Sequence, residues 1–190
     1  MLDLDTVTRI QRNADELHSG EVVDKTIADL ADQIGNEICN TNPIICCVMN
    51  GGIVFCNGLM RHWDFPMELD YVHTSRYRED TTGSNLIWQS LPKLALQDRT
   101  IVIVDDIFDE GETLKTILQA FTAQGAKKVL SAVLIEKEHD RKQDDIRPDF
   151  IGLTVEDRYV FGAGMDYKGY FRNLSGIYAI GTADVGTADA

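Results

Sequence analysis

The sequence predicts an α/β fold in which helices cover both faces of a parallel sheet. From residue 21 to residue 135, segments with the apolar spacing of a helix alternate with short apolar segments, which is the pattern of repeated strand–helix–strand units. Residues 101–104 read Ile-Val-Ile-Val. A continuous β-branched run of this kind is typical of a parallel strand buried on both faces.

Two helices, a strand and a third helix are expected in the first third of the chain. Residues 6–17 are compatible with a short helix, and Ser19 can cap a stronger helix over 21–38. A strand over 44–49, a turn at 50–52 and a helix over 53–61 follow. The helix over 21–38 is supported by apolar residues at helical spacing, namely Val23, Ile27, Leu30, Ile34 and Ile38.

The rest of the chain continues the alternation. A strand is expected over 67–74, with Leu69, Tyr71 and His73 on one face. Residues 75–85 are polar and aperiodic, which fits either a functional loop or an ordinary surface loop. The later expected elements are strands at 86–89, 100–104, 129–135, 150–155 and 177–180, a helix at 113–123 that Gly125 ends, and a charged loop at 139–145. Residues 181–190 have little to bury and are expected to form a flexible tail.

Length and composition favour a single soluble domain. The chain has 190 residues, of which 44% are hydrophobic and 26% charged. A net charge of −13 makes it a poor general binder of nucleic acid or anionic membranes. No apolar stretch approaches the ~20 residues of a membrane span, and the acidic start lacks the form of a signal peptide. A cytoplasmic protein is the default expectation.

Cysteines and histidines give no sign of a metal site. The four cysteines, at 39, 46, 47 and 56, lack metal-ligand spacing and are expected to be buried, reduced thiols. The four histidines, at 18, 62, 73 and 139, show no ligand spacing either. We therefore assign the histidines no role.

The most informative segment is residues 101–114, where a buried strand ends in acids, a glycine and the start of a helix. Asp105 and Asp106 can accept hydrogen bonds from two vicinal hydroxyls or attract a hard cation such as Mg²⁺. Gly111 permits close approach of the backbone, and the amides of residues 110–113 can bind a phosphate at the start of the helix. The Thr113 hydroxyl adds a further donor. The segment thus suits a ligand with a sugar diol, a phosphate and a metal.

Two features of this segment leave other interpretations open. Glu110 and Glu112 would repel a phosphate unless both side chains point away from it. An Asp-Asp pair after a strand also occurs in phosphoacceptor receiver domains, in simple magnesium sites and in helix-capping clusters without a ligand. In a parallel sheet, however, the turn at 50–52 and the acidic segment both follow carboxyl ends of strands, so they are expected to meet in one cleft.

The pattern of 101–114 resembles the phosphoribosyl pyrophosphate signature of type I phosphoribosyltransferases. A second match is Arg147-Pro-Asp-Phe-Ile-Gly, followed by Val160-Phe-Gly-Ala-Gly-Met-Asp-Tyr and Gly169-Tyr-Phe-Arg-Asn-Leu, which is similar to the hood segment of the hypoxanthine-guanine phosphoribosyltransferases. The resemblance spans about residues 14–180. It implies one domain over 1–180, with a core at about 20–145 and a small hood formed by N-terminal residues and about 146–180.

The resemblance assigns the donor-binding residues. It implies that Asp105 and Asp106 hold the ribose hydroxyls and that residues 110–113 hold the 5′-phosphate. The loop Met49-Asn50-Gly51-Gly52 matches the segment whose backbone grips pyrophosphate. Arg172 matches an arginine that contacts pyrophosphate, and Asp166, with Asp105, matches an acid linked to Mg²⁺.

The resemblance also assigns the base-binding residues. Asp109 would be the general base or acid near purine N7. Lys137, just after the expected strand 129–135, would donate to the purine 6-oxygen. Tyr159 would stack on the base and Val160 would offer backbone contacts to its edge. Residues 75–85 match the flexible lid of the family.

Two positions and the lid depart from the family pattern. Asn50 stands where many relatives have lysine, and Glu110 stands where threonine is common. The lid carries Arg76, Tyr77 and Arg78 and differs from the serine-tyrosine pattern of many members. The basic lid residues would compensate for Asn50.

The implied activity is transfer of 5-phosphoribosyl from phosphoribosyl pyrophosphate to hypoxanthine, guanine or both, with Mg²⁺ as cofactor. The implied assembly is a homodimer or homotetramer. The alternatives are a phosphoribosyltransferase for xanthine or another base, and a donor-sensing RNA-binding regulator, against which the acidic charge argues.

Overall fold

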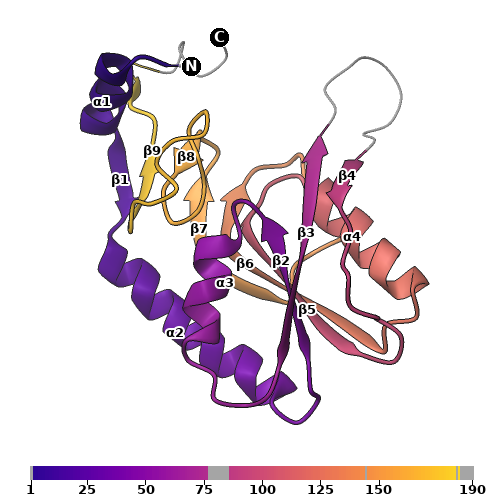
Figure 1. Cartoon of the computed structure of the whole chain (residues 1–190). Helices are drawn as coiled ribbons and strands as arrows, with labels where there is room; N and C mark the ends of the chain where they lie inside the picture. Colours follow the sequence, from indigo (N-terminus) through magenta and orange to yellow (C-terminus); the bar gives the residue numbers. More distant parts are fainter. Residues whose placement is uncertain (1, 77–85, 144, 183, 185–190) are drawn as a thin grey trace.

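The main body of the protein is a six-stranded sheet. The computed structural model describes residues 2–76, 86–143, 145–182 and 184. The strand order is β4-β3-β2-β5-β6-β7 (Figure 1). All neighbours in the sheet are parallel except β3 and β4. The strands are β2 (Ile44–Met49), β3 (Glu68–Arg76), β4 (Leu86–Ser90), β5 (Thr100–Phe108), β6 (Lys128–Glu138) and β7 (Phe150–Glu156).

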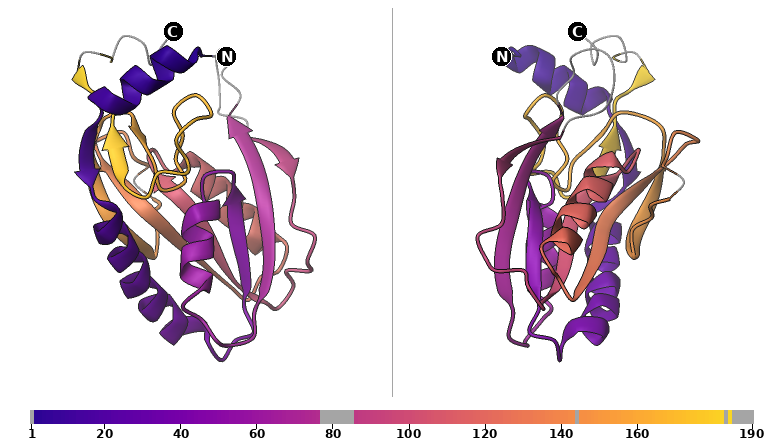
Figure 2. Two further views of the ribbon diagram at one scale, coloured as in Figure 1. Left: turned by 60° about the vertical axis from the view of Figure 1, so that its left-hand side comes forward. Right: turned by 90° about the vertical axis from the view of Figure 1, so that its right-hand side faces the viewer.

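Helices cover both faces of this sheet, as the sequence predicts. Helices α2 (Gly20–Ile38) and α3 (Ile53–Met60) pack on one face, and α4 (Glu112–Ala123) packs on the other (Figures 1 and 2). Successive strand side chains divide between the two faces: Ile45 and Val102 belong to the core under α2 and α3, whereas Ile44 and Ile101 belong to the core under α4. Both faces are therefore apolar, which explains the unbroken apolar runs in the sequence.

The expected helix 21–38 is confirmed. Val23, Ile27, Leu30, Ile34 and Ile38 are all buried, and the Ser19 hydroxyl accepts the Val22 N–H at the start of the helix.

A second, smaller layer lies beside the carboxyl ends of the main strands. It contains α1 (Leu4–Asn13) and a three-stranded antiparallel sheet of β1 (Asp15–His18), β9 (Ile177–Ala179) and β8 (Val160–Phe161) (Figure 1). Val7 and Ile10 of α1 pack with Phe161, Tyr167 and Phe171 in a separate apolar core. We call this layer, with the loops of residues 157–176, the hood.

The N-terminal prediction was wrong in part. The first helix ends at Asn13 rather than at 17, because Ala14 takes an extended conformation and residues 15–18 form β1, paired with β9. The expected core also ended too early. Strand β7 pairs with β6 in the main sheet, so the core reaches Glu156 rather than 145.

Two strands extend further than their apolar residues indicate. Strand β5 continues to Phe108, so Asp105 and Asp106 lie within it rather than beyond its end. Strand β6 continues to Glu138, so Lys137 also lies within a strand. The ladder between them runs on as far as the pair Phe108–Glu136. Backbone hydrogen bonds do not depend on side-chain polarity, which is why hydrophobicity underestimated both strands.

The lid and most of the tail lie outside the described residues. Those residues are 77–85 of the expected lid, and 183 and 185–190 of the expected tail. The expectation of a tail that is flexible from residue 181 is wrong at Asp184. This residue is buried and accepts hydrogen bonds from Arg9 and Asn13. Among the described residues, no helix is both long enough and apolar enough to cross a membrane.

Candidate active site

Two adjoining hollows lie where the main sheet meets the hood. The larger, of about 320 Å³, is lined by β5, the loop after β2, the start of α4 and part of the hood. The smaller, of about 200 Å³, lies between β5, β6 and β8. Asp106, Ile107, Asp109 and Asp166 line both hollows, so the two form one cleft with two ends. This is the position expected for a ligand site in a parallel sheet.

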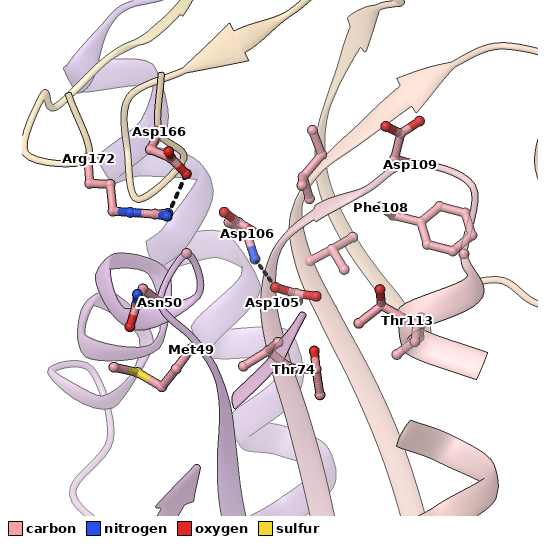
Figure 3. Close-up of a pocket in the computed structure, with 16 residues that line it drawn as sticks. Met49, Asn50, Thr74, Asp105, Asp106, Phe108, Asp109, Thr113, Asp166 and Arg172 are labelled. Atoms are coloured by element: carbon pink, nitrogen blue, oxygen red, sulfur yellow. Dashed lines mark hydrogen bonds and ion pairs between the residues drawn. The ribbon is translucent and has the colours of Figure 1, made fainter. Parts of the chain in front are cut away.

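Asp105 and Asp106 form the floor of the larger hollow. The Asp106 N–H donates to Asp105 Oδ1 at 2.9 Å (Figure 3). Burial raises the pKa of both carboxyls, and the neighbouring charge of Asp106 raises the pKa of Asp105 further. A group that donates hydrogen bonds or carries positive charge would relieve this repulsion. The pair is therefore suited to a ligand with hydroxyls or a cation.

The loop after β2 packs directly on this pair. The peptide bond between Met49 and Asn50 is cis, and both Asn50 and Gly51 line the larger hollow. A Cβ atom at Gly51 would collide with the Asp106 carboxylate. Glycine is needed there because the backbone approaches Asp106 so closely.

The start of α4 faces the same hollow. Gly111 precedes the helix with φ of +89°, a left-handed conformation that favours glycine. Gly111 and Thr113 line the hollow, whereas Glu110 and Glu112 are not among its lining residues. The Glu110 carboxylate is instead 3.8 Å from Nε of Arg141. Neither glutamate therefore lines the place where a phosphate would bind, and the helix begins there with first-turn backbone amides, which have no partner within a helix.

The hood contributes Asp166 and Arg172 from the other side. The Arg172 Nη2 atom is 2.5 Å from Asp166 Oδ1 (Figure 3), and Arg172 Nη1 donates to the Gly164 carbonyl at 2.7 Å. The Gly169 N–H donates to the other Asp166 oxygen at 2.6 Å. Both side chains are thereby held at the rim of the larger hollow.

The smaller hollow is lined by the residues expected to bind a base. Lys137 Nζ is 3.4 Å from Asp109 Oδ2 and 3.9 Å from Asp157 Oδ1. Lys137 thus points into the cleft rather than pairing with its neighbours Glu136 and Glu138. Tyr159 is 41% exposed and contacts Tyr167 edge-to-face, with 5.6 Å between the ring centroids, so part of Tyr159 is accessible to a ligand. Val160 is buried in β8, opposite Ala179.

Sequence reasoning missed one residue that contacts the cleft from behind. His139, to which no role was assigned, has Nε2 2.6 Å from Asp109 Oδ1. The missed signal is the strand period: in a strand that reaches 138, residues 137 and 139 point to the same side. The other residues expected at the site line one hollow or both, whereas Glu110 and Glu112 line neither.

Comparison with known proteins gives the family. Residues 13–168 match the phosphoribosyl transferase domain. The chain is 32% identical to the hypoxanthine-guanine phosphoribosyltransferase of Bacillus subtilis over 83% of this chain and 88% of the relative. It is 29% identical to the hypoxanthine-guanine-xanthine phosphoribosyltransferase of Tritrichomonas foetus over 90% of each chain.

Solved structures agree with the sequence matches. A structure described as a hypoxanthine-guanine-xanthine phosphoribosyltransferase superimposes with a TM-score of 0.80 at 28% identity, covering 88% of this chain and 96% of the other. A Bacillus anthracis hypoxanthine-guanine phosphoribosyltransferase also gives 0.80, at 26% identity, covering 88% of this chain and 97% of the other. Sequence match, fold and cleft agree: the chain is a phosphoribosyltransferase of purine salvage and belongs to the hypoxanthine-guanine phosphoribosyltransferase family.

Proposed function

We propose that this enzyme transfers the 5-phosphoribosyl group from phosphoribosyl pyrophosphate to N9 of a 6-oxopurine, hypoxanthine or guanine. The observation that carries the proposal is the single cleft with two chemically different ends. One end presents carboxylates, helix amides and an arginine, which suit a sugar bearing phosphates. The other presents a lysine, an exposed aromatic ring and Asp109, which suit a flat base that must exchange a proton.

The donor occupies the larger hollow. The Asp105 and Asp106 carboxylates accept hydrogen bonds from the ribose hydroxyls, and the amides of residues 110–113 bind the 5′-phosphate. The backbone of Asn50 and Gly51 and the guanidinium of Arg172 contact pyrophosphate. Anchoring the sugar at its hydroxyls and its phosphate leaves the anomeric carbon facing the shared middle of the cleft.

The acids at the larger hollow fit Mg²⁺. Asp105 and Asp166 would hold it, together with oxygens of the donor, because Mg²⁺ is usually bound by one or two carboxylates plus substrate phosphates. The raised pKa of Asp105 supports this fit, since a cation would offset the repulsion from Asp106. When bound, Mg²⁺ neutralises charge on the leaving pyrophosphate.

The base occupies the smaller hollow. Lys137 donates to the purine 6-oxygen, Tyr159 stacks on the ring, and the Val160 backbone contacts its edge. The C1′–N9 bond forms as the C1′–oxygen bond to pyrophosphate breaks, and Asp109 takes the proton that the purine loses.

An assay with four purines tests the proposal. The enzyme is mixed with phosphoribosyl pyrophosphate, Mg²⁺ and hypoxanthine, guanine, xanthine or adenine, and pyrophosphate release is followed. We expect release with hypoxanthine or guanine and much less with adenine. Release with none of the four, or with adenine above the oxopurines, would contradict the proposal.

Lys137 is expected to select oxopurines over aminopurines. In Lys137→Ala, the ratio of kcat/KM for hypoxanthine to that for adenine should fall by about 10²-fold, because the donor to the 6-oxygen is lost. Using the ratio cancels any general loss of activity. Lys25→Ala, which removes an exposed lysine on α2, should leave the ratio unchanged. An unaltered ratio in Lys137→Ala would remove this role from Lys137.

The described surface also supports a homo-oligomer, most simply a dimer. Ile53 and Leu69 are 48% and 57% exposed, and Tyr71 is 40% exposed, although all three are large and apolar. They surround a hollow of about 350 Å³ between α3 and β3. We infer that a second copy of the chain covers this patch. Sedimentation velocity at micromolar concentration should show a dimer or tetramer, whereas a monomer would contradict the inference.

A further inference from the structure

Asp109 does not stand alone in the cleft. His139 Nε2 lies 2.6 Å from Asp109 Oδ1, and Lys137 Nζ lies 3.4 Å from Asp109 Oδ2. The His139 side chain is only 4% exposed, whereas that of Asp109 is 31% exposed. The imidazole is therefore buried behind the carboxylate, and the carboxylate keeps access to the cleft.

The hydrogen bonds of His139 fix its tautomer. The backbone N–H of Arg141 donates to His139 Nδ1 at 3.1 Å, so Nδ1 acts as an acceptor and carries no proton. The proton of the neutral ring is then on Nε2, which donates it to Asp109 Oδ1. A carboxylate oxygen that accepts one hydrogen bond can still accept another.

The loop that carries His139 is tied down at both sides. The Arg141 guanidinium donates twice to the Asp157 carboxylate, at 2.7 and 3.0 Å, and its Nε lies 3.8 Å from Glu110. Asp157 follows β7, and Glu110 follows Asp109 in the acidic segment. The Arg141 side chain thus fixes the backbone N–H that orients the imidazole.

A metal ion is a poorer explanation of the same cluster. Ligand atoms of Asp109, His139 and Asp157 lie within 4.8 Å of one another, as they would around a cation. Lys137 Nζ, however, already lies 3.4 Å from one carboxylate and 3.9 Å from the other. Together with the Arg141 guanidinium on Asp157, its positive charge balances the two acids and would repel a further cation.

We propose that His139 is a positioning residue for the transfer reaction. Its neutral imidazole holds Asp109 in one orientation, so that the carboxylate meets the purine proton without first reorienting. This proposal rests on the role of Asp109 proposed above. As the C1′–N9 bond forms and the C1′–oxygen bond breaks, the purine proton passes to Asp109 and the His139 proton stays on Nε2.

Steady-state kinetics of the full-length enzyme test the proposal. In His139→Ala, kcat should fall about 10- to 100-fold with KM for donor and purine nearly unchanged, because a misplaced catalytic group slows the chemical step more than binding. His139→Gln should recover most of kcat, since its amide can reach the position of Nε2. His139→Asn, with a shorter side chain, should not. His62→Ala, which removes an exposed histidine, is the matched control and should behave as wild type.

A double variant separates positioning from a structural effect. If His139 acts through Asp109, His139→Ala should slow Asp109→Asn no further. Losses that multiply, or a wild-type kcat in His139→Ala, would overturn the proposal. Equal values of kcat for His139→Gln and His139→Asn would also overturn the proposal. This comparison remains informative if His139→Ala does not fold. A wild-type kcat in Asp109→Asn would instead overturn the role of Asp109 itself.

Discussion

Asp109→Asn is expected to lower kcat by about 10²- to 10⁴-fold, the usual contribution of a general base or acid. Asparagine keeps the size and the acceptor oxygen that faces His139, so the cleft should retain its shape. It cannot take a proton from the purine. The donor binds at the other end of the cleft, and its affinity should therefore change little.

Two measurements on the same variant check this expectation. Pyrophosphate release gives kcat, and calorimetric titration with phosphoribosyl pyrophosphate and Mg²⁺ gives the donor Kd. Asp140→Asn, which changes an exposed aspartate in the next loop, serves as control. If Asp109→Asn weakened donor binding as much as it lowered kcat, Asp109 would be a binding residue rather than the group that moves the proton.

The local pattern of the sequence was enough to predict the part of the cleft that β5, the loop after β2 and the start of α4 form. The residues of the hood and Lys137 were expected only because of the resemblance to the family. The acidic segment 101–114 combines a buried strand, paired acids and a helix start within fourteen residues, so its parts are placed together by chain connectivity alone. The meeting of this segment with Asn50 and Gly51 followed from the geometry of parallel sheets. Both expectations needed only short-range patterns and one general rule of topology.

The parts that sequence reasoning missed depend on distant partners. Strand β1 has no apolar alternation, since Asp15 and Glu16 are exposed. It is a strand because it pairs with β9, more than 150 residues later in the chain. His139 has no motif of its own and gains its contact only because β6 runs beside β5. Pairings between distant segments of this kind leave little trace in local composition.

Asp105→Asn is expected to stabilise the free protein and to weaken donor binding. Burial and the charge of Asp106 raise the pKa of Asp105 above its usual value of 3.8. A carboxyl whose pKa is raised by folding contributes stability that is fully present below its unfolded pKa and is lost as the pH rises through its folded pKa. At pH 7 the group therefore opposes folding, because it must either carry its charge in a buried site or take up a proton that it lacks in the unfolded chain. Replacing it with a neutral amide should help.

The expected gain is about 1 kcal/mol in the free energy of unfolding at pH 7, a typical effect of relieving strain at an active site. For a protein of this size it corresponds to a rise of about 2–4 °C in Tm. Thermal unfolding between pH 4 and pH 8 checks it: the difference in Tm between variant and wild type should shrink towards pH 4. Asp32→Asn, at an exposed position on α2, should show no such gain.

The same substitution should raise the donor Kd by about 10- to 100-fold, because a hydrogen bond to a charged group contributes about 1.5–3 kcal/mol. Mg²⁺ adds to the expected loss, since Asp105 is one of its proposed ligands. A variant that is more stable and binds the donor less well would show that the acid pair opposes folding. It would also show that the cost of burying the pair is offset only when the ligand is bound. If Asp105→Asn lost stability and affinity together, the pair would instead support the fold, and its repulsion would be relieved within the free protein, for example by Arg172 beside Asp106.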